Sequence, residues 1–362
     1  MPTFAEAFER FPNAQNSTRV LLTNFYLAVV GINATVLTFE FYTAILGVVL
    51  TVFHLTILTR KAMRTSSIMS IMISVAICDL ISMLLAIASR DTVMSFEPQE
   101  CTPPLTFFAL KLYLIIHAIR DNVIRISTWL SVTMALIRYL VLKLASRPGG
   151  LHQVQRFQFG FSVFGVATVI STLLSLLFYL RSDVVVIGEW KPADNCPDAF
   201  PPQPLYEILP SDLFTAYNGL IHHVFMFLNG TCSKILPCLL FPILTGLLIL
   251  ELREAQKKRT TSDKNNTDRT TGLVIFMTVS FFIALLPSGI MTSLQAVYTD
   301  IGFLYMSSYV EFICSALLTL NSTLHCFICF TMSTQYRKTV KNLPKKKEKP
   351  KLSLTNSMFT KV

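Results

Sequence analysis

The chain has 362 residues, of which 52% are hydrophobic and only 14% are charged, and its formal net charge is +10. This composition is too apolar for an ordinary soluble domain. Eight cysteines in a chain of this length also exclude a small secreted module held together by disulfides. A positive net charge can indicate a nucleic-acid partner, but its placement along this chain favours a membrane surface instead.

Apolar stretches long enough to cross a bilayer recur along the chain. A helix needs about 20 apolar residues to span a hydrocarbon core of about 30 Å. Six such stretches are Thr38–Leu58, Ile68–Ala88, Phe157–Leu180, Val224–Leu250, Gly272–Leu294 and Phe303–Met332. Residues 105–142 contain no Gly or Pro and predict one further long helix rather than a hairpin. The sequence therefore predicts an all-α membrane protein with seven spanning helices; an additional span over residues 20–37 is the alternative.

Lysine and arginine residues gather on one side of the predicted membrane. With seven spans, the segments 59–66, 143–156, 251–271 and 333–362 share one side and hold 21 of the 31 Lys and Arg residues, whereas the opposite side holds five. By the positive-inside rule the basic side is cytoplasmic. We therefore expect a multi-pass protein of the plasma membrane, with the N-terminus outside the cell and the C-terminus in the cytoplasm.

This topology divides the chain into four parts. Residues 1–37 form an extracellular segment, and residues 38–332 form the spanning domain. Residues 333–343 form a short helix, because Met332, Tyr336, Val340 and Leu343 recur on one face with cations between them. Residues 344–362 form a cytoplasmic tail whose "PKKKEKPK" resembles a nuclear signal but, beside a span, favours contact with anionic lipid.

Three residues on the expected outer side are candidates for covalent modification. Cys101 and Cys196 both fall outside, where disulfides form, and we expect a bond that ties the second outer loop to the start of the third helix. The sequon at Asn16 is a candidate for glycosylation.

Ionisable residues within the spans are candidates for function, because burying charge in a membrane is costly. Asp79 lies near the middle of the second span and either locks helices together or acts as a polar switch. The third helix carries the candidate ligand-binding residues His117, Arg120, Asp121 and Arg125. Asp121 and Arg125 are four residues apart and could neutralise each other; otherwise a cation remains for a carboxylate or carbonyl of a ligand.

Several segments resemble rhodopsin-like G protein-coupled receptors: "AICDL", "STWLSVTMALIRYLV", "SKILPCLLFP" and "NSTLHCFICFTMSTQYRKTV". The segment "FHLTILTRKAMRTSSI" is especially similar to the nematode serpentine receptor class w chemoreceptors, a group that is itself similar to the myosuppressin and FMRFamide peptide receptors. The resemblance covers residues 45–342. It implies a seven-helix bundle with a short amphipathic eighth helix.

The resemblance also implies roles for particular residues. Arg138, at the cytoplasmic end of the third helix, matches the arginine that couples such receptors to a G protein, although Ile137 stands where the family has an acid. The polar switch would comprise Asp79, Asn321, Ser322 and His325, the last three in place of the usual Asn-Pro-x-x-Tyr ending. Pro237 and Pro287 are suited to kink the fifth and sixth helices.

We therefore expect a receptor that binds an extracellular neuropeptide or chemosensory ligand, a peptide or a small molecule such as an odorant, and that acts on a heterotrimeric G protein. The alternative from another class is a ligand-gated channel or transporter, although internal repeats typical of transporters are not recognisable. No nucleophile–base–acid order or glycine-rich phosphate loop indicates an enzyme. Cys326-x-x-Cys329 and His222-His223 lack further ligands, so we expect neither a metal nor a cofactor.

Overall fold

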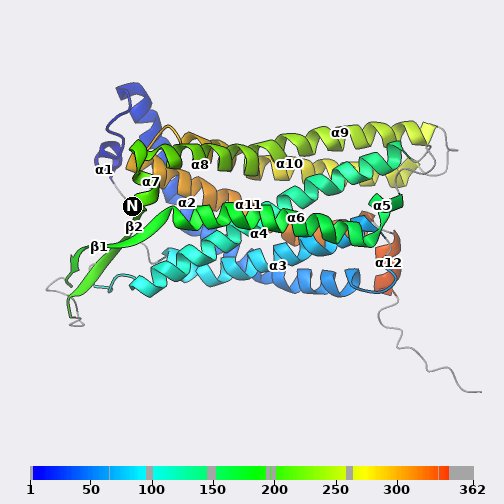
Figure 1. Cartoon of the computed structure of the whole chain (residues 1–362), viewed down its shortest axis with the longest axis horizontal. Coiled ribbons are helices and arrows are strands. Elements are labelled where there is room, and N and C mark those ends of the chain that lie inside the picture. The colour runs from blue at the N-terminus through cyan, green and yellow to red at the C-terminus, as the bar shows by residue number, and fades with distance from the viewer. Residues whose placement is uncertain are drawn as a thin grey trace, which may run out of the picture.

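The computed structural model describes residues 3–64, 66–94, 101–144, 152–192, 196, 201–257, 264–332 and 334–341. Long helices run side by side along the molecule, and an antiparallel two-stranded hairpin projects from one end (Figure 1). We call this the hairpin end. The opposite end, which carries the last short helix, is called the α12 end.

The helices and strands follow one another in a simple order. They are α1 (Phe4–Glu9), α2 (Asn16–Leu58), α3 (Ser67–Met94), α4 (Phe107–Lys143), α5 (His152–Gln155), α6 (Phe157–Leu180), β1 (Ser182–Trp190), β2 (Gln203–Pro210), α7 (Asp212–Thr215), a 3₁₀ turn (Tyr217–Gly219), α8 (Leu220–Gly230), a π-helical segment (Thr231–Ile235), α9 (Leu236–Lys257), α10 (Lys264–Leu294), α11 (Ile301–Met332) and α12 (Thr334–Lys341). Because α8, the π-helical segment and α9 are continuous, the described residues contain seven helical units of the length that the sequence predicts for spans.

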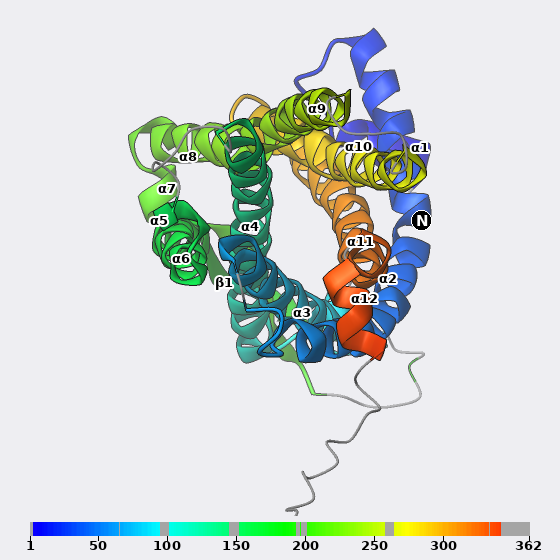
Figure 2. The same cartoon turned by 90° about the vertical axis from the view of Figure 1, so that its right-hand side faces the viewer.

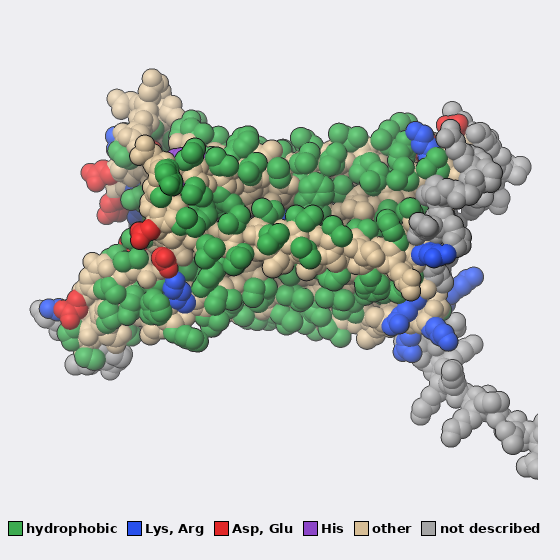
Figure 3. All heavy atoms as spheres, viewed as in Figure 1, with side chains coloured by type: hydrophobic (Ala, Val, Ile, Leu, Met, Phe, Trp, Pro, Cys, Tyr) green, Lys and Arg blue, Asp and Glu red, His purple; other side chains and the backbone are tan. Residues whose placement is uncertain are grey.

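Apolar side chains cover the long sides of the molecule. Five of these units are long and apolar enough to cross a membrane, and α10 contributes the shorter apolar stretch Thr278–Leu294. Helix α4 is not in this group, and it carries Arg120, Asp121, Arg125 and Arg138. Hydrophobic side chains form a broad band between the two ends, and lysines and arginines gather at the α12 end (Figure 3). This band is what a lipid-facing surface requires, since the hydrocarbon core offers no partners for polar groups.

Helix α4 is the central element of the bundle. It is one helix from Phe107 to Lys143, as the absence of Gly and Pro predicted, and the Thr106 hydroxyl caps it by accepting a hydrogen bond from the Ala109 N–H (3.3 Å). It packs against α3, α6 and α9, and in the end-on view it lies between α6 and the other helices (Figure 2). Side chains on different faces of α4 can therefore contact several helices of the bundle.

Helix α2 begins earlier than the sequence analysis predicted. It starts at Asn16 rather than near Thr38, so residues 16–37 are not a separate segment before the first span. No proline occurs between Asn16 and Leu58, and backbone hydrogen bonding continues through the whole stretch. At 1.5 Å per residue its 43 residues measure about 64 Å. The additional span considered for residues 20–37 is thus the first part of this same helix.

Residues preceding α2 pack back onto the bundle at the hairpin end. Ala7 and Phe11 are fully buried and share an apolar cluster with Tyr26 of α2 and Phe303 of α11. The Gly302 N–H donates a hydrogen bond to the Arg10 carbonyl (3.1 Å). The N-terminal segment therefore joins the ends of two helices that are adjacent in space but distant in sequence.

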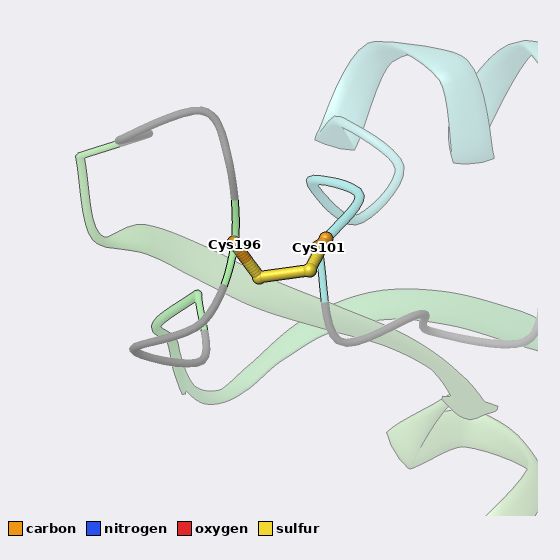
Figure 4. Close-up of a disulfide and its surroundings, with 2 residues drawn as sticks. All are labelled: Cys101 and Cys196. Carbon is orange, nitrogen blue, oxygen red and sulfur yellow. A yellow bond between two sulfur atoms is a disulfide. The ribbon is translucent and has the colours of Figure 1, made fainter.

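The disulfide predicted between Cys101 and Cys196 is present (Figure 4). Cys101 precedes α4, and Cys196 lies in the connection between the paired strands β1 and β2. The bond therefore fixes the hairpin to the start of the central helix, as expected.

The short helix after α11 is amphipathic, as predicted. Tyr336 is buried with Ile57, Leu58 and Met63, and its hydroxyl lies 2.9 Å from the His54 Nδ1. Burial raises the pKa of the Tyr336 hydroxyl, so it stays neutral at physiological pH. Arg337, Lys338 and Lys341 are exposed on the other face. Leu343 and the basic tail 344–362 lie outside the described residues.

Replacing Phe11 by alanine should destabilise the protein, because a fully buried aromatic ring is removed from the contact between α2 and α11. The expected cost is about 3–5 kcal/mol, measured as a lower Tm of the purified protein in detergent. Phe4→Ala is the control, because that ring is 47% exposed. Equal Tm changes in the two variants would contradict the packing role of Phe11.

Candidate functional site

A cavity of about 60 Å³, lined by both charged and apolar side chains, lies between α4, the π-helical segment, α10 and α11. Its lining includes all four candidate ligand-binding residues of the third span, His117, Arg120, Asp121 and Arg125. Further lining residues come from the other elements: Ile124, Thr128, Ser233, Lys234, Leu285, Ser288, Glu311, Phe312, Cys314, Ser315 and Leu318. The structure thus brings the residues selected from the sequence to one cavity.

Arg120 forms an ion pair with Glu40 of α2. The same carboxylate oxygen accepts hydrogen bonds from the hydroxyls of Ser315 and Thr319 on α11, both at 3.0 Å. Glu40 is only 4% exposed, so its charge depends on these donors. The cluster joins α2, α4 and α11 through one buried carboxylate.

Arg125 forms an ion pair with Asp121 one turn earlier on α4. Of the two alternatives that the sequence left open, mutual neutralisation is therefore the arrangement in the structure. The Arg125 guanidinium also donates hydrogen bonds to the Ser171 carbonyl (3.0 Å), the Ser175 hydroxyl (3.1 Å) and the Asn229 side-chain oxygen (3.2 Å). These bonds tie α4 to α6 and to α8.

Lys234 and Glu311 form the third ion pair at the cavity, with the Lys234 Nζ 2.8 Å from the Glu311 Oε1. The ammonium also donates to the hydroxyls of Ser288 (2.9 Å) and Thr292 (3.1 Å) on α10. Lys234 belongs to the π-helical segment Thr231–Ile235, and π-helical turns occur often at functional sites. The pair connects the fifth, sixth and seventh spans.

Arg120, Arg125 and Lys234 are therefore each paired with an acid. For Arg125 the acid is on the preceding turn of the same helix, and for the other two it is on another helix. Sequence reasoning missed Glu40, Lys234 and Glu311 as site residues. The signal was present, because each is an ionisable residue inside a long apolar stretch. What the sequence did not show was that these residues face the charges of α4.

The expected polar switch is only partly assembled in one place. The Asp79 carboxylate accepts a hydrogen bond from the Ser127 hydroxyl (3.0 Å), and its other oxygen lies 2.9 Å from the His325 Nδ1. Asn321 instead accepts a hydrogen bond from the Ser280 hydroxyl of α10 (3.0 Å). Ser322 is partly exposed, and among the described residues it has no hydrogen-bond partner. The structure thus pairs Asp79 with His325 and places Asn321 in a separate contact.

Arg138 lies near the opposite end of α4 from this cavity. It is partly exposed and follows the buried Ile137. Within the ranges that the structure describes, Arg138 has no acidic partner. This fits the sequence observation that the acid usual before such an arginine is missing, and it leaves the guanidinium donors available.

Prolines occur in both helices that were expected to bend. Pro287 lies inside α10, and Pro242, which the sequence analysis did not select, lies inside α9. Pro237 is the second residue of α9, and only Leu236 separates it from the end of the π-helical segment. A proline removes one backbone N–H from the helix, and a π-helical turn is one way to accommodate the loss. The kinks themselves stay a prediction.

Asp121→Asn should destabilise the protein strongly, because it leaves the Arg125 charge buried without an acid. Breaking a buried pair typically costs about 3–5 kcal/mol. Adding Arg125→Gln should recover part of the lost Tm, which a double-mutant cycle measures. Asp183→Asn is the control, because it breaks the more exposed pair with Lys111 (57% and 25% exposed), where the expected loss is below about 1 kcal/mol. Strictly additive losses would show that Asp121 and Arg125 are not coupled.

Comparison with known proteins places this arrangement in a family. Residues 38–347 match the serpentine-type seven-transmembrane G protein-coupled chemoreceptors of the Srw family. A stretch of 232 residues is 30% identical to the G-protein coupled receptor dmsr-1 of Caenorhabditis elegans. This alignment covers 60% of the chain and 42% of the relative, so less than half of that protein's length is matched.

The family match includes the cavity, the Asp79–His325 pair, Arg138 and the final short helix. It confirms the resemblance that the sequence motifs indicated, and it agrees with the helical bundle and its apolar surface. The chain is a multi-pass membrane protein, and it belongs to the Srw family of serpentine seven-transmembrane G protein-coupled chemoreceptors.

Proposed function

We propose that this protein is a plasma-membrane receptor that binds a neuropeptide or chemosensory ligand at the hairpin end and activates a heterotrimeric G protein at the α12 end. The hairpin end is extracellular and the α12 end is cytoplasmic, because lysines and arginines gather at the α12 end. Asn16 is then on the outer side, where its exposed side chain can carry a glycan.

The observation that carries this proposal is the position of two polar sites on one helix. Arg120 lines the cavity and Arg138 lies 18 residues later on α4, which is about 27 Å along the helix axis. A membrane receptor needs such an arrangement, because its ligand and its G protein are on opposite sides of the bilayer. Family membership supports the same assignment.

The ligand site in this proposal is the cavity, with His117, Arg120, Asp121 and Arg125 among its contacts. Ligand binding favours one of two arrangements of the bundle. The movable elements are α9 and α10, because both contain internal prolines. Helix α10 lines the cavity through Ser288, and α9 directly follows the π-helical segment that carries Lys234. The polar contacts of Asp79 with His325, and of Asn321 with Ser280, rearrange between the two states.

At the α12 end, the open state exposes Arg138 to the C-terminal helix of a G protein α-subunit. The guanidinium offers five N–H donors and stays charged, so it can bind the backbone carbonyls at the end of an inserted helix. Arg337, Lys338 and Lys341 of α12 contact anionic lipid of the inner leaflet.

Arg138→Ala should abolish ligand-evoked nucleotide exchange while cell-surface ligand binding persists. Cells expressing the variant and a promiscuous G protein would be screened with a panel of amidated peptides and small odorants, at matched surface expression. We expect the ligand-evoked exchange to fall by at least about tenfold, which corresponds to about 1.4 kcal/mol. Lys143→Ala is the control, because this exposed cation ends the same helix.

Unchanged coupling in the Arg138 variant would refute its assigned role. A ligand-evoked ion current that persists without any G protein would favour a channel instead.

A further inference from the structure

The six charged side chains of these three ion pairs differ in how far they are accessible, and all of them except Glu40 line the cavity. The cations are nearly covered, since the side chains of Arg120, Arg125 and Lys234 are 12%, 3% and 10% exposed. Among the acids, Glu40 is 5% and Asp121 12% exposed. The side chain of Glu311 is 36% exposed. Glu311 is thus the most exposed of the charged lining residues, so the charge that the cavity offers to a ligand is a carboxylate.

Glu311 also keeps hydrogen-bonding capacity. Its Oε1 accepts the bond from Lys234, whereas within the described ranges its Oε2 has no partner. Ser233 lies beside Lys234 on the π-helical segment and lines the same cavity. It is 5% exposed, and its hydroxyl has no partner among the described residues. A buried hydroxyl without a partner costs free energy, so a ligand that bonds to it is favoured.

The guanidinium groups do not argue for an anionic ligand. The Nε atoms of Arg120 and Arg125 are buried without partners among the described residues, so they can donate to a ligand oxygen. Their charges are already neutralised by Glu40 and Asp121. A neutral carbonyl satisfies them, whereas a ligand carboxylate would add negative charge beside Glu311 in a site of low dielectric.

The size of the cavity limits what enters it. A water molecule requires about 10–15 Å³ of volume measured in this way. The cavity of about 60 Å³ therefore admits a terminal group a few water molecules in size. An ammonium or a guanidinium group fits this limit, and both donate several hydrogen bonds.

We infer that the ligand presents a cationic end group, an ammonium or a guanidinium, to Glu311 and the Ser233 hydroxyl. This inference rests on the proposed receptor function and specifies its ligand. The ligand cation competes with Lys234 for the Glu311 carboxylate. It thereby loosens the contact between the π-helical segment and α11, which is the contact that connects the fifth and seventh spans.

The test measures the Tm of the purified full-length receptor with four small probes. Nα-acetyl-arginine amide and Nα-acetyl-lysine amide are cationic, Nα-acetyl-citrulline amide has nearly the shape of the arginine probe without its charge, and Nα-acetyl-glutamate amide is anionic. The cationic probes should raise the Tm by about 2 °C or more at saturation. The other two should leave it unchanged. Comparing the Tm increase with the arginine probe and with the lysine probe shows whether the site prefers a guanidinium or an ammonium group.

Glu311→Gln should abolish the stabilisation by both cationic probes. Because this change leaves Lys234 without its acid, a second variant exchanges the pair, Lys234→Glu with Glu311→Lys. The exchange keeps an ion pair but makes the accessible charge positive, so the glutamate probe should now stabilise the receptor. The exchange Lys111→Glu with Asp183→Lys is the matched control, and it should keep the wild-type preference because neither residue of this pair lines the cavity.

The inference is overturned if the glutamate probe stabilises the wild type, if neither cationic probe does, or if Glu311→Gln keeps the response to cations. The Tm measurement requires no G protein, so it tests the cationic ligand group independently of the proposed receptor function. Stabilisation by cations in a receptor that activates no G protein would refute the proposed function alone.

Discussion

Charge burial inside an apolar bundle is the constraint on which the structure depends. A charged group removed from water is tolerated only when an opposite charge and further hydrogen bonds replace its hydration. Arg120, Arg125 and Lys234 each obtain an acid in this way. Further hydroxyl or carbonyl groups bond to Arg125, to Lys234 and to Glu40, the acid that pairs with Arg120. Because those partners come from α2, α6, α8, α10 and α11, charge neutralisation also determines how the helices are arranged around α4.

The same ion pairs make the bundle suited to switching. Apolar side chains slide past one another at low cost, whereas a buried ion pair has one favourable geometry and resists small displacements. The Lys234–Glu311 pair joins the fifth and seventh spans, and the Lys234 ammonium also bonds to α10. A ligand that competes for one member changes the free-energy difference between two discrete arrangements, which is the requirement for coupling between distant sites.

The two ends of the molecule are stabilised by different interactions. At the hairpin end, a disulfide and the buried Phe11 hold the loop and the N-terminal segment against the helices. At the α12 end, Tyr336 closes the bundle through packing and its contact with His54, while Arg138 has no acid among the described residues to hold it. The hairpin end is thus held firmly, whereas the Arg138 guanidinium at the other end is available to a partner. This difference agrees with a molecule that receives a signal at the hairpin end and transmits it at the α12 end.

Much of the fold was predictable because the bilayer imposes a pattern that a single sequence records. The length of apolar stretches and the charge of the loops predicted the spans, and the absence of Gly and Pro in residues 105–142 predicted the unbroken α4. The disulfide followed from the expected side of two cysteines. Helix α2 begins 22 residues before the predicted start of the first span, because nothing in the sequence pattern distinguishes a span from its helical continuation.

The sequence by itself determined which ionisable residues of α4 lie in the membrane, since hydropathy and helical periodicity are local properties. Only the tertiary structure decided their partners. Glu40 and Glu311 lie 80 residues before Arg120 and 77 residues after Lys234, and helix packing alone brings them together. It also decided which charge remains accessible, because exposure depends on every neighbouring helix. For that reason the sequence left open whether Arg125 is neutralised by Asp121 or faces a ligand, whereas the structure pairs the two and leaves Glu311 the most exposed of the paired charges around the cavity.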